Sequence, residues 1–286
     1  MKLTAFVDGG GTKTRVRLAD ALVGAIVEDI VVGPANLGLG FEACWNQIEH
    51  AIDLAGLDPP VKCVVGVAGT EYIKERQKFL SSAPYPTVLV SDRDAGLFGA
   101  HSGRPGGCLT VGTGVSFAWL NSRGVVTRRG GFGFVLGDQG GGAWMGHRLL
   151  CALTRLADRG DLLPSHIKLI ESLEIGCTPN DWITFANQAT PLDFGSLAPR
   201  VLNTRSSLSL SANIITEGAT ELESLVHEFP KALPLALVGG LAHVYEKHFA
   251  ALGYEVVTAD GNALDGLSYI DQHLSTLSID RWKSDD

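Results

Sequence analysis

Two segments of this chain share one pattern, in which an apolar strand enters a turn of glycine and threonine and leaves as a second strand. In the first segment, the apolar run 3–7 leads into the turn 8–14. In the second, residues 109–111 lead into the turn 112–114. A strand, a glycine turn and a returning strand predict a β-hairpin. Two such hairpins in one chain predict two lobes of related architecture.

Strands and helices alternate along the rest of the chain. Strands are predicted at 22–32, 63–67, 87–90 and 233–238, and helices at 41–57, 71–79, 140–157, 207–229 and 241–252. This alternation implies an α/β fold with a partly parallel sheet. The pair Gly106-Gly107 precedes the second hairpin, so we expect an N-terminal lobe of 1–107 and a C-terminal lobe of 108–286. The tail after Leu277 is polar and is expected to be frayed.

Charge and cysteine usage exclude several classes of protein. The chain has 23 Lys and Arg against 31 Asp and Glu, a net charge of −8, and its basic residues are scattered. We therefore expect no nucleic-acid partner and no anionic membrane partner. The five cysteines lack the spacing of a zinc site, and their odd number argues against a disulfide framework. Both observations favour a cytoplasmic protein. The uncharged stretch 105–122 is rich in glycine, which predicts buried strands in place of a membrane span.

The first glycine turn carries groups that bind phosphate. GxxxxGK[ST] does not occur in the chain, and the turn lacks the third glycine of GxGxxG, so neither a P-loop nor a Rossmann site fits. Gly10, Gly11, Thr12 and Lys13 can still form a nest of backbone N–H groups, with a hydroxyl added by Thr12. Asp8 at the strand end could hold a hydrated Mg²⁺ beside the phosphates. For this motif alone, an ordinary glycine-rich hairpin is the alternative.

Two further glycine turns favour a nucleotide site. Gly112, Thr113 and Gly114 form the second turn, and two such turns on two lobes can grip one polyphosphate from both sides. At 238–241 a strand ends in Gly239-Gly240 and a helix follows, an arrangement that would let the backbone approach a base or an α-phosphate. Taken alone, that glycine pair is better explained as a tight strand-to-helix turn.

The order of these three turns resembles that of the superfamily of sugar kinases, heat-shock chaperone ATPases and actin. The glycine-rich signature 130–146 is similar to that of the BadF/BadG/BcrA/BcrD ATPase family, which includes N-acetylglucosamine kinases and bacterial glucosamine kinases. Asn36 within 33–36 and the segment 262–266 also match this family. The resemblance implies a two-lobed actin-like ATPase fold of duplicated ribonuclease H-like domains, with ATP and Mg²⁺ in the cleft between the lobes. It also implies a homodimer.

The same resemblance assigns a catalytic base. Residues 88–95 place Asp92 and Asp94 at a strand end where a helix begins, and one of these carboxylates could simply cap that helix. In the kinases that the chain resembles, this strand ends in Asn-Asp, and the aspartate takes the proton from the sugar 6-hydroxyl. That role falls on Asp92, with Ser91 in place of the asparagine. We expect Asp94 to be a cap or a surface charge.

Sugar recognition is expected from Asn36, Asp138 and the loop formed by Gly131, Phe132 and Gly133. Hexose hydroxyls both donate and accept hydrogen bonds, so an amide and a carboxylate are suitable partners. Asp138 could instead be a structural acceptor for its own glycine-rich loop. The chain departs from the family at three positions, where Phe132 replaces a common Trp, Gln139 replaces a common Glu and Val115 replaces a common Ser. The first two changes affect the expected identity of the sugar.

The leading hypothesis is an ATP- and Mg²⁺-dependent kinase for O6 of N-acetylglucosamine, the first candidate, or of glucosamine. A second is an ATPase activator of a dehydratase, but such activators hold an iron–sulfur cluster through cysteines of their signature loops. Here Cys108 and Cys151 lie outside any such match. A third is a non-catalytic nucleotide-dependent sugar sensor or an actin-like assembly protein, although binding alone needs no base such as Asp92. Amino-sugar-dependent release of ADP separates the first hypothesis from the others.

Overall fold

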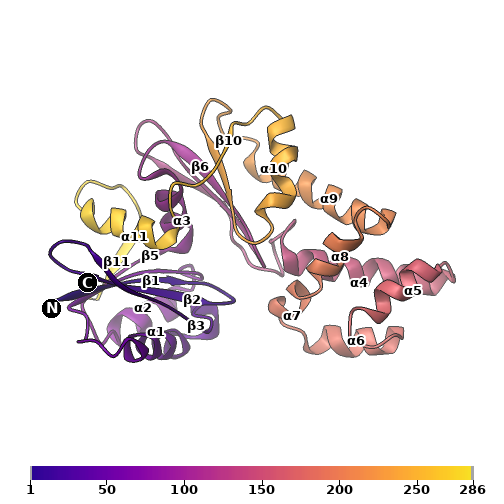
Figure 1. The fold of residues 1–286 in the computed structure, drawn as a ribbon, viewed down its shortest axis with the longest axis horizontal. Coiled ribbons are helices and arrows are strands. Elements are labelled where there is room, and N and C mark those ends of the chain that lie inside the picture. Colours follow the sequence, from indigo (N-terminus) through magenta and orange to yellow (C-terminus); the bar gives the residue numbers. More distant parts are fainter. Residues whose placement is uncertain (1, 285–286) are drawn as a thin grey trace.

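Two sheets of the same internal order form the framework of residues 2–284, the residues described in this computed structural model (Figure 1). The first sheet has the order β11-β5-β4-β1-β2-β3, and the second has the order β10-β9-β6-β7-β8. The strands are β1 (Leu3–Gly9), β2 (Thr14–Asp20), β3 (Ile26–Val32), β4 (Lys62–Val67), β5 (Thr87–Ser91), β6 (Gly106–Val111), β7 (Val115–Leu120), β8 (Val126–Gly130), β9 (Leu235–Val238), β10 (Val256–Val257) and β11 (Arg281–Lys283).

Each sheet repeats one topology. In the first, β1, β2 and β3 form an antiparallel meander, and β4 and β5 then extend it in parallel beside β1. In the second, β6, β7 and β8 form the meander, and β9 and β10 extend it beside β6. The repetition confirms the predicted α/β fold with two related lobes. Both predicted hairpins are present, as β1–β2 and β6–β7.

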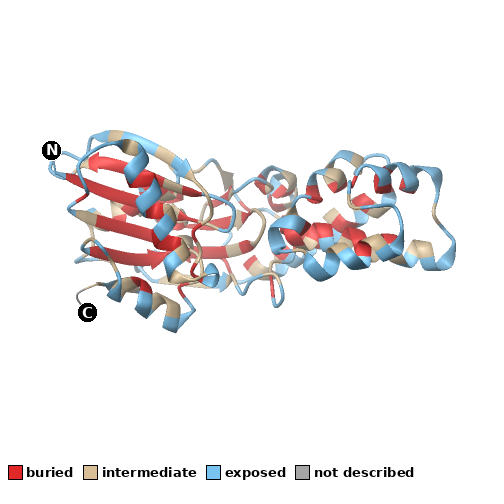
Figure 2. Cartoon of the chain, turned by 90° about the horizontal axis from the view of Figure 1, so that it is seen from below, coloured by how far each residue is buried: buried red, intermediate tan, exposed pale blue. Residues whose placement is uncertain are grey.

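Helices cover the sheets in three groups. The first lobe carries a short 3-10 helix, η1 (Leu37–Leu39), with α1 (Phe41–Ala55) and α2 (Ile73–Ser81). The second lobe carries α4 (Gly142–Arg159), α5 (Pro164–Glu171), α6 (Pro179–Gln188), α7 (Pro191–Gly195), α8 (Ala198–Thr204), α9 (Ser209–Val226) and α10 (Ala242–Ala251). Buried residues line the strands of the first lobe and the inward faces of these helices (Figure 2). In the described residues, no helix has the length and apolar character needed to cross a membrane.

The third group, α3 (Asp92–His101) and α11 (Ala263–Gln272), lies between the two sheets. Its core combines Val64 and Val90 of the first sheet with Cys108 and Ala236 of the second. The two helices approach so closely that a Cβ on Gly99 would lie 2.0 Å from a backbone oxygen of α11's N-cap residue. Only glycine allows this approach, because any side chain would collide with backbone.

The segment 262–266 therefore has a structural role in this layer. Asn262 caps α11, since its Oδ1 accepts from the Leu264 N–H at 2.8 Å. Asp265 accepts from the Arg17 guanidinium at 2.6 Å, which joins α11 to β2. A Cβ on Gly266 would lie 1.9 Å from the carbonyl oxygen of Ala95, so glycine is required here as well.

The C-terminal residues differ from the sequence-based expectation. Within the tail expected to fray, residues 281–283 form β11, which pairs antiparallel with β5 and places Trp282 opposite Leu89, and residues 285–286 lie outside the described residues. The Arg76 guanidinium lies over the ring of Trp282, 4.1 Å from the ring centre. This contact stabilises β11, which is too short to show an alternating pattern in the sequence. Because α11 and β11 pack on the first sheet, residues 263–283 of the predicted lobe 108–286 lie with the first lobe. The strand expected at 22–32 begins later, at Ile26, after a turn.

Candidate active site

The parallel strands β1, β4 and β5 bring the expected polar residues to one edge of the first sheet. Asp8 lies near the end of β1, and Asp92 follows β5 directly. Asn36 forms an isolated bridge with Ala68, just past the end of β4. Carboxyl ends of neighbouring parallel strands meet at the same edge, which is where open α/β sheets bind ligands.

The first two glycine turns face each other across the lobes. The hydroxyls of Thr12 and Thr113 are 3.3 Å apart. Within the first turn, the Gly10 N–H donates to the carbonyl of Lys13 at 3.1 Å. Apart from its chain neighbours, no residue of the described range 2–284 comes within 4 Å of a Cβ built on Gly11 or on Gly112, so open space adjoins both backbones. The two turns thus present backbone and hydroxyl groups to one space, as a polyphosphate site requires.

The third turn joins the end of β6. The Leu241 N–H donates to the Val111 carbonyl at 3.0 Å. Gly239 has φ 100°, and a Cβ there would lie 2.5 Å from that same carbonyl oxygen. A Cβ on Gly240 would meet nothing within 4 Å. Gly239 is therefore needed for the turn itself, and Gly240 leaves open space next to the second phosphate turn.

The local structure of α3 places Asp92 at the N-terminus of a helix. Ser91 is the N-cap, and its hydroxyl oxygen accepts from the Arg93 N–H at 3.2 Å. Oδ1 of Asp92 accepts from the same N–H at 2.9 Å. Burial and the neighbouring charge of Asp8 raise the pKa of Asp92 to about 6, against the lowering effect of this hydrogen bond. A carboxylate with this pKa is ionised at neutral pH and is a competent proton acceptor.

Asp94 differs from the expectation that it would be a cap or a surface charge. It is fully buried, and its carboxylate receives two hydrogen bonds from Arg128 of β8, at 2.8 and 2.7 Å. Burial raises the pKa of Asp94, while Arg128 opposes that rise. The partner lies in the other sheet, so Asp94 links the helix that begins at Asp92 to the second lobe.

Asp138 contacts the second phosphate turn. Its Oδ1 accepts from the Val115 N–H at 2.8 Å, and its own backbone is left-handed, with φ 62°. A Cβ on Gly114 would lie 2.8 Å from both carboxylate oxygens, so a larger residue there would displace the Asp138 side chain from this position. The sequence left open whether Asp138 acts as a structural acceptor, and the structure shows such a contact, with the Val115 N–H. Burial raises its pKa.

The other expected sugar residues occupy two separate segments. Asn36 caps η1, because its Oδ1 accepts from the Gly38 N–H at 2.7 Å. In the signature loop, the Gly131 N–H donates to the Val115 carbonyl at 3.1 Å, and Phe134 packs on Phe194 with ring centres 5.2 Å apart. Between these two attachments the loop is open. Phe132 is 71% exposed, and Gly133 is exposed beside it.

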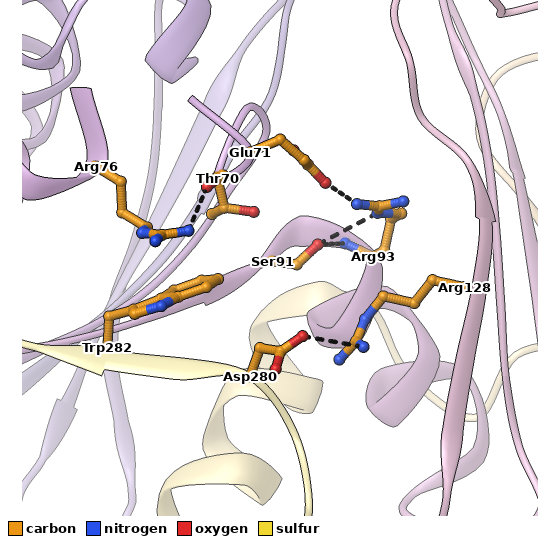
Figure 3. Close-up of a pocket in the computed structure, with 8 residues that line it drawn as sticks. All are labelled: Thr70, Glu71, Arg76, Ser91, Arg93, Arg128, Asp280 and Trp282. Carbon is orange, nitrogen blue, oxygen red and sulfur yellow. Dashed lines mark hydrogen bonds and ion pairs between the residues drawn. The ribbon is translucent and has the colours of Figure 1, made fainter. Parts of the chain in front are cut away.

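Several residues that the sequence analysis did not single out line a cavity of about 180 Å³ beside the start of α3 (Figure 3). Its walls come from both lobes and from the C-terminal segment, and its lining residues are Thr70, Glu71, Arg76, Ser91, Arg93, Arg128, Asp280 and Trp282. Arg93 forms an ion pair with Glu71, and Arg128 forms one with Asp280 at 3.3 Å. The sequence offered one signal of this cavity, because Arg93, which lines it, directly follows the expected base Asp92.

The carboxylates at this edge suit a divalent cation that is shared with a ligand. Burial raises the pKa of Asp8, and Arg15 and Lys13 oppose the rise. Within residues 2–284, no group of three or more His, Cys, Asp or Glu side chains could form a metal cage. Mg²⁺ is commonly held by one or two carboxylates together with substrate phosphates. Asp8 next to the first phosphate turn fits that mode of binding.

The two sheets of one order and the facing glycine turns define the two-lobed fold that actin-like ATPases and sugar kinases share. Residues 7–256 match the BadF/BadG/BcrA/BcrD ATPase family, and the chain belongs to this family. The resemblance seen in the sequence is thereby confirmed.

Relatives with assigned activities include sugar kinases. The glucosamine kinase of Vibrio cholerae is 30% identical over 209 residues, which cover 69% of this chain and 69% of that protein. An N-acetylmuramic acid/N-acetylglucosamine kinase of Clostridium acetobutylicum is 25% identical over 171 residues, 56% of each chain. A crystal structure from Chromobacterium violaceum, described as that of a candidate N-acetylglucosamine kinase, matches with a TM-score of 0.84 at 27% identity, and the match covers 94% of this chain and 99% of that one.

Proposed function

We propose that this protein is an amino-sugar kinase that transfers the γ-phosphoryl group of ATP to O6 of N-acetylglucosamine or glucosamine. The observation that carries the proposal is a carboxylate of raised pKa, Asp92, on the same sheet edge as a phosphate turn that faces its counterpart in the other lobe. The names of the relatives support the substrate class.

In this proposal ATP lies between the lobes. The first turn, with Gly10, Gly11, Thr12 and Lys13, and the second, with Gly112, Thr113 and Gly114, donate hydrogen bonds to its phosphates. Gly240 gives the backbone room to approach the nucleoside, and Gly239 shapes that turn. Phosphoryl transfer depends mainly on such positioning and on neutralisation of charge. Asp8 would hold Mg²⁺, which would further neutralise the charge of the phosphates.

Asp92 acts on the sugar. The 6-hydroxyl attacks the γ-phosphorus, a new O6–P bond forms, and the bond from that phosphorus to the β,γ-bridging oxygen breaks. The hydroxyl proton passes to the Asp92 carboxylate, and ADP leaves with the bonding electrons. General-base catalysis of this kind contributes about 10²- to 10⁴-fold to the rate.

Asn36, Asp138, Gly131, Phe132 and Gly133 are proposed to bind the sugar. Asp138 uses Oδ1 for Val115, so Oδ2 is the oxygen proposed to accept from a sugar hydroxyl. We keep N-acetylglucosamine as the first candidate and glucosamine as the second, and the names of the relatives include both sugars. Following the family resemblance, we also propose a cytoplasmic homodimer, which light scattering of the purified protein tests for its oligomeric state.

A coupled assay of ADP release with Mg-ATP tests the proposal. The panel of sugars is N-acetylglucosamine, glucosamine, N-acetylmannosamine and glucose. We expect saturable turnover with one amino sugar, loss of that turnover in Asp92→Asn, and no loss in the control Asp158→Asn, whose side chain is exposed on α4. ADP release that no amino sugar accelerates would contradict the proposal and would favour an ATPase activator.

A further inference from the structure

Two side-chain links run in opposite directions between the start of α3 and the end of β8. Arg93 on α3 donates from Nη1 to the carbonyl of Gly130 at 3.0 Å. Arg128 on β8 donates from Nε and Nη2 to the buried carboxylate of Asp94 at 2.8 and 2.7 Å. We refer to Arg93, Asp94, Arg128 and Gly130 as the α3–β8 clamp. Because each element supplies one guanidinium and one acceptor, neither element can shift along the other without loss of both links.

Arg93 makes contacts on three sides. Its Nη2 pairs with the Glu71 carboxylate, and its Nε donates to the Ser91 hydroxyl at 3.4 Å (Figure 3). A Cβ built on Gly131 would lie 3.0 Å from Nη1, so the loop backbone rests directly on the guanidinium. The side chain is only 13% exposed. A guanidinium that donates to three acceptors from three different nitrogens is held more rigidly than an exposed surface arginine.

The clamp joins two parts of the proposed active site. On α3 its residues follow Asp92 directly, and on β8 its last residue begins the signature loop that contains Gly131, Phe132 and Gly133. The Gly131 N–H is already bound by the Val115 carbonyl, beside the second phosphate turn. Arg93 binds the carbonyl of Gly130, the residue before Gly131, and so holds the same short segment from another side. The proposed base and the proposed sugar loop are therefore held in register across the boundary between the lobes.

We propose that Arg93 is a positioning residue that sets the sugar loop relative to Asp92. This inference rests on the proposed kinase function. Arg93 itself contacts Ser91, Glu71 and Gly130, and acts on the substrate through the segments that it holds. A lysine at this position would keep the charge, but a single ammonium on a flexible stem cannot bind the three acceptors in one plane. Arginine is thus required for its shape as well as its charge.

The test compares Arg93→Ala and Arg93→Lys with Arg129→Ala. Arg129 is a matched control because it lies on β8 between Arg128 and Gly130, yet its side chain pairs with Glu228 and packs over Trp119, 5.5 Å from the ring centre. For both Arg93 variants we expect kcat/KM for the amino sugar to fall about 10- to 100-fold, the size of one lost hydrogen bond from a charged group. The KM for ATP should stay within about twofold of wild type, since the phosphate turns are untouched.

Chemical rescue separates positioning from general loss of structure. Guanidinium ion at low millimolar concentration should restore part of the sugar kcat/KM of Arg93→Ala, and ethylammonium should not. Three results would each overturn the inference while leaving the kinase function intact. They are wild-type sugar kinetics in Arg93→Ala, a rise in the KM for ATP as large as the fall in kcat/KM for the sugar, and full activity in Arg93→Lys. Absence of sugar-dependent turnover in the wild-type protein would refute the kinase function, and the inference with it.

Discussion

Replacement of Asp92 by Asn should abolish catalysis and stabilise the protein. Asn has nearly the same shape, and its Oδ1 can still accept from the Arg93 N–H that now bonds to Asp92 at 2.9 Å. What it removes is a negative charge that is buried and lies near Asp8. Turnover should fall about 10²- to 10⁴-fold, the usual contribution of a general base. Stability at neutral pH should rise, because the folded state no longer carries this charge.

The structure gives the size and the sign of the gain in stability. The pKa of Asp92 rises from 3.8 to about 6 in the folded protein. At about 1.4 kcal/mol per pKa unit, ionised Asp92 disfavours folding by about 3 kcal/mol at most. Asp92 is only half-buried, so water screens part of its charge and we expect a gain of about 1–2 kcal/mol. Between pH 6 and 3.8 the folded wild type binds a proton that the unfolded chain does not, so the wild type recovers this stability as the pH falls.

Thermal and urea denaturation of the nucleotide-free protein in EDTA measure this gain. Asp92→Asn should be more stable than wild type at pH 7.5, and the difference should shrink towards pH 4.5. Asp158→Asn, an exposed substitution on α4, serves as the control and should change stability little at either pH. A variant with no added stability at pH 7.5, or with an equal gain at both pH values, would refute the claim that the ionised Asp92 carboxylate destabilises the folded protein.

Three other predictions follow from the same geometry. Wild-type kcat/KM for the sugar should fall tenfold per pH unit below about pH 6, where Asp92 becomes protonated, and a flat profile down to pH 5 would argue against this base. Asp8→Asn should raise the Mg²⁺ concentration needed for half-maximal rate and, by removing a neighbouring charge, move the acid limb of the pH profile to lower pH. Gly99→Ala should destabilise the protein by about 1–3 kcal/mol through overpacking against α11, as measured by urea denaturation. Gly96→Ala on the same helix, where a Cβ would meet only Cys108 Sγ at 3.9 Å, should not be destabilising.

The sequence predicted those features that are written in local patterns. The hairpins around Gly10 and Gly112 combine apolar strands with glycine turns, and such a pattern lies within about fifteen residues. Their recurrence predicted two lobes of related architecture, and the strand order of each sheet came from the structure. The strand end at Asp92 was also predictable, because a buried apolar run stops there.

The missed features depend on partners that are distant in the sequence. Asp94 looks like a helix cap or a surface charge until Arg128 of the other sheet is placed beside it. Arg93 acts through the carbonyl of Gly130. Every residue has a backbone carbonyl, so the sequence does not indicate which one will accept a hydrogen bond from Arg93. The strand β11 has three residues, so no alternation could show it, and its place on the sheet depends on pairing with β5.

The position of the phosphate on the product tests the central claim most directly. The protein is incubated with Mg-ATP and N-acetylglucosamine or glucosamine, and the sugar product is examined by phosphorus–proton correlation NMR. The account predicts a monophosphate whose phosphorus couples to the two protons on C6, formed by the wild-type protein and not by Asp92→Asn. A phosphate on any other carbon, or ATP consumed with no sugar phosphate formed, would contradict it.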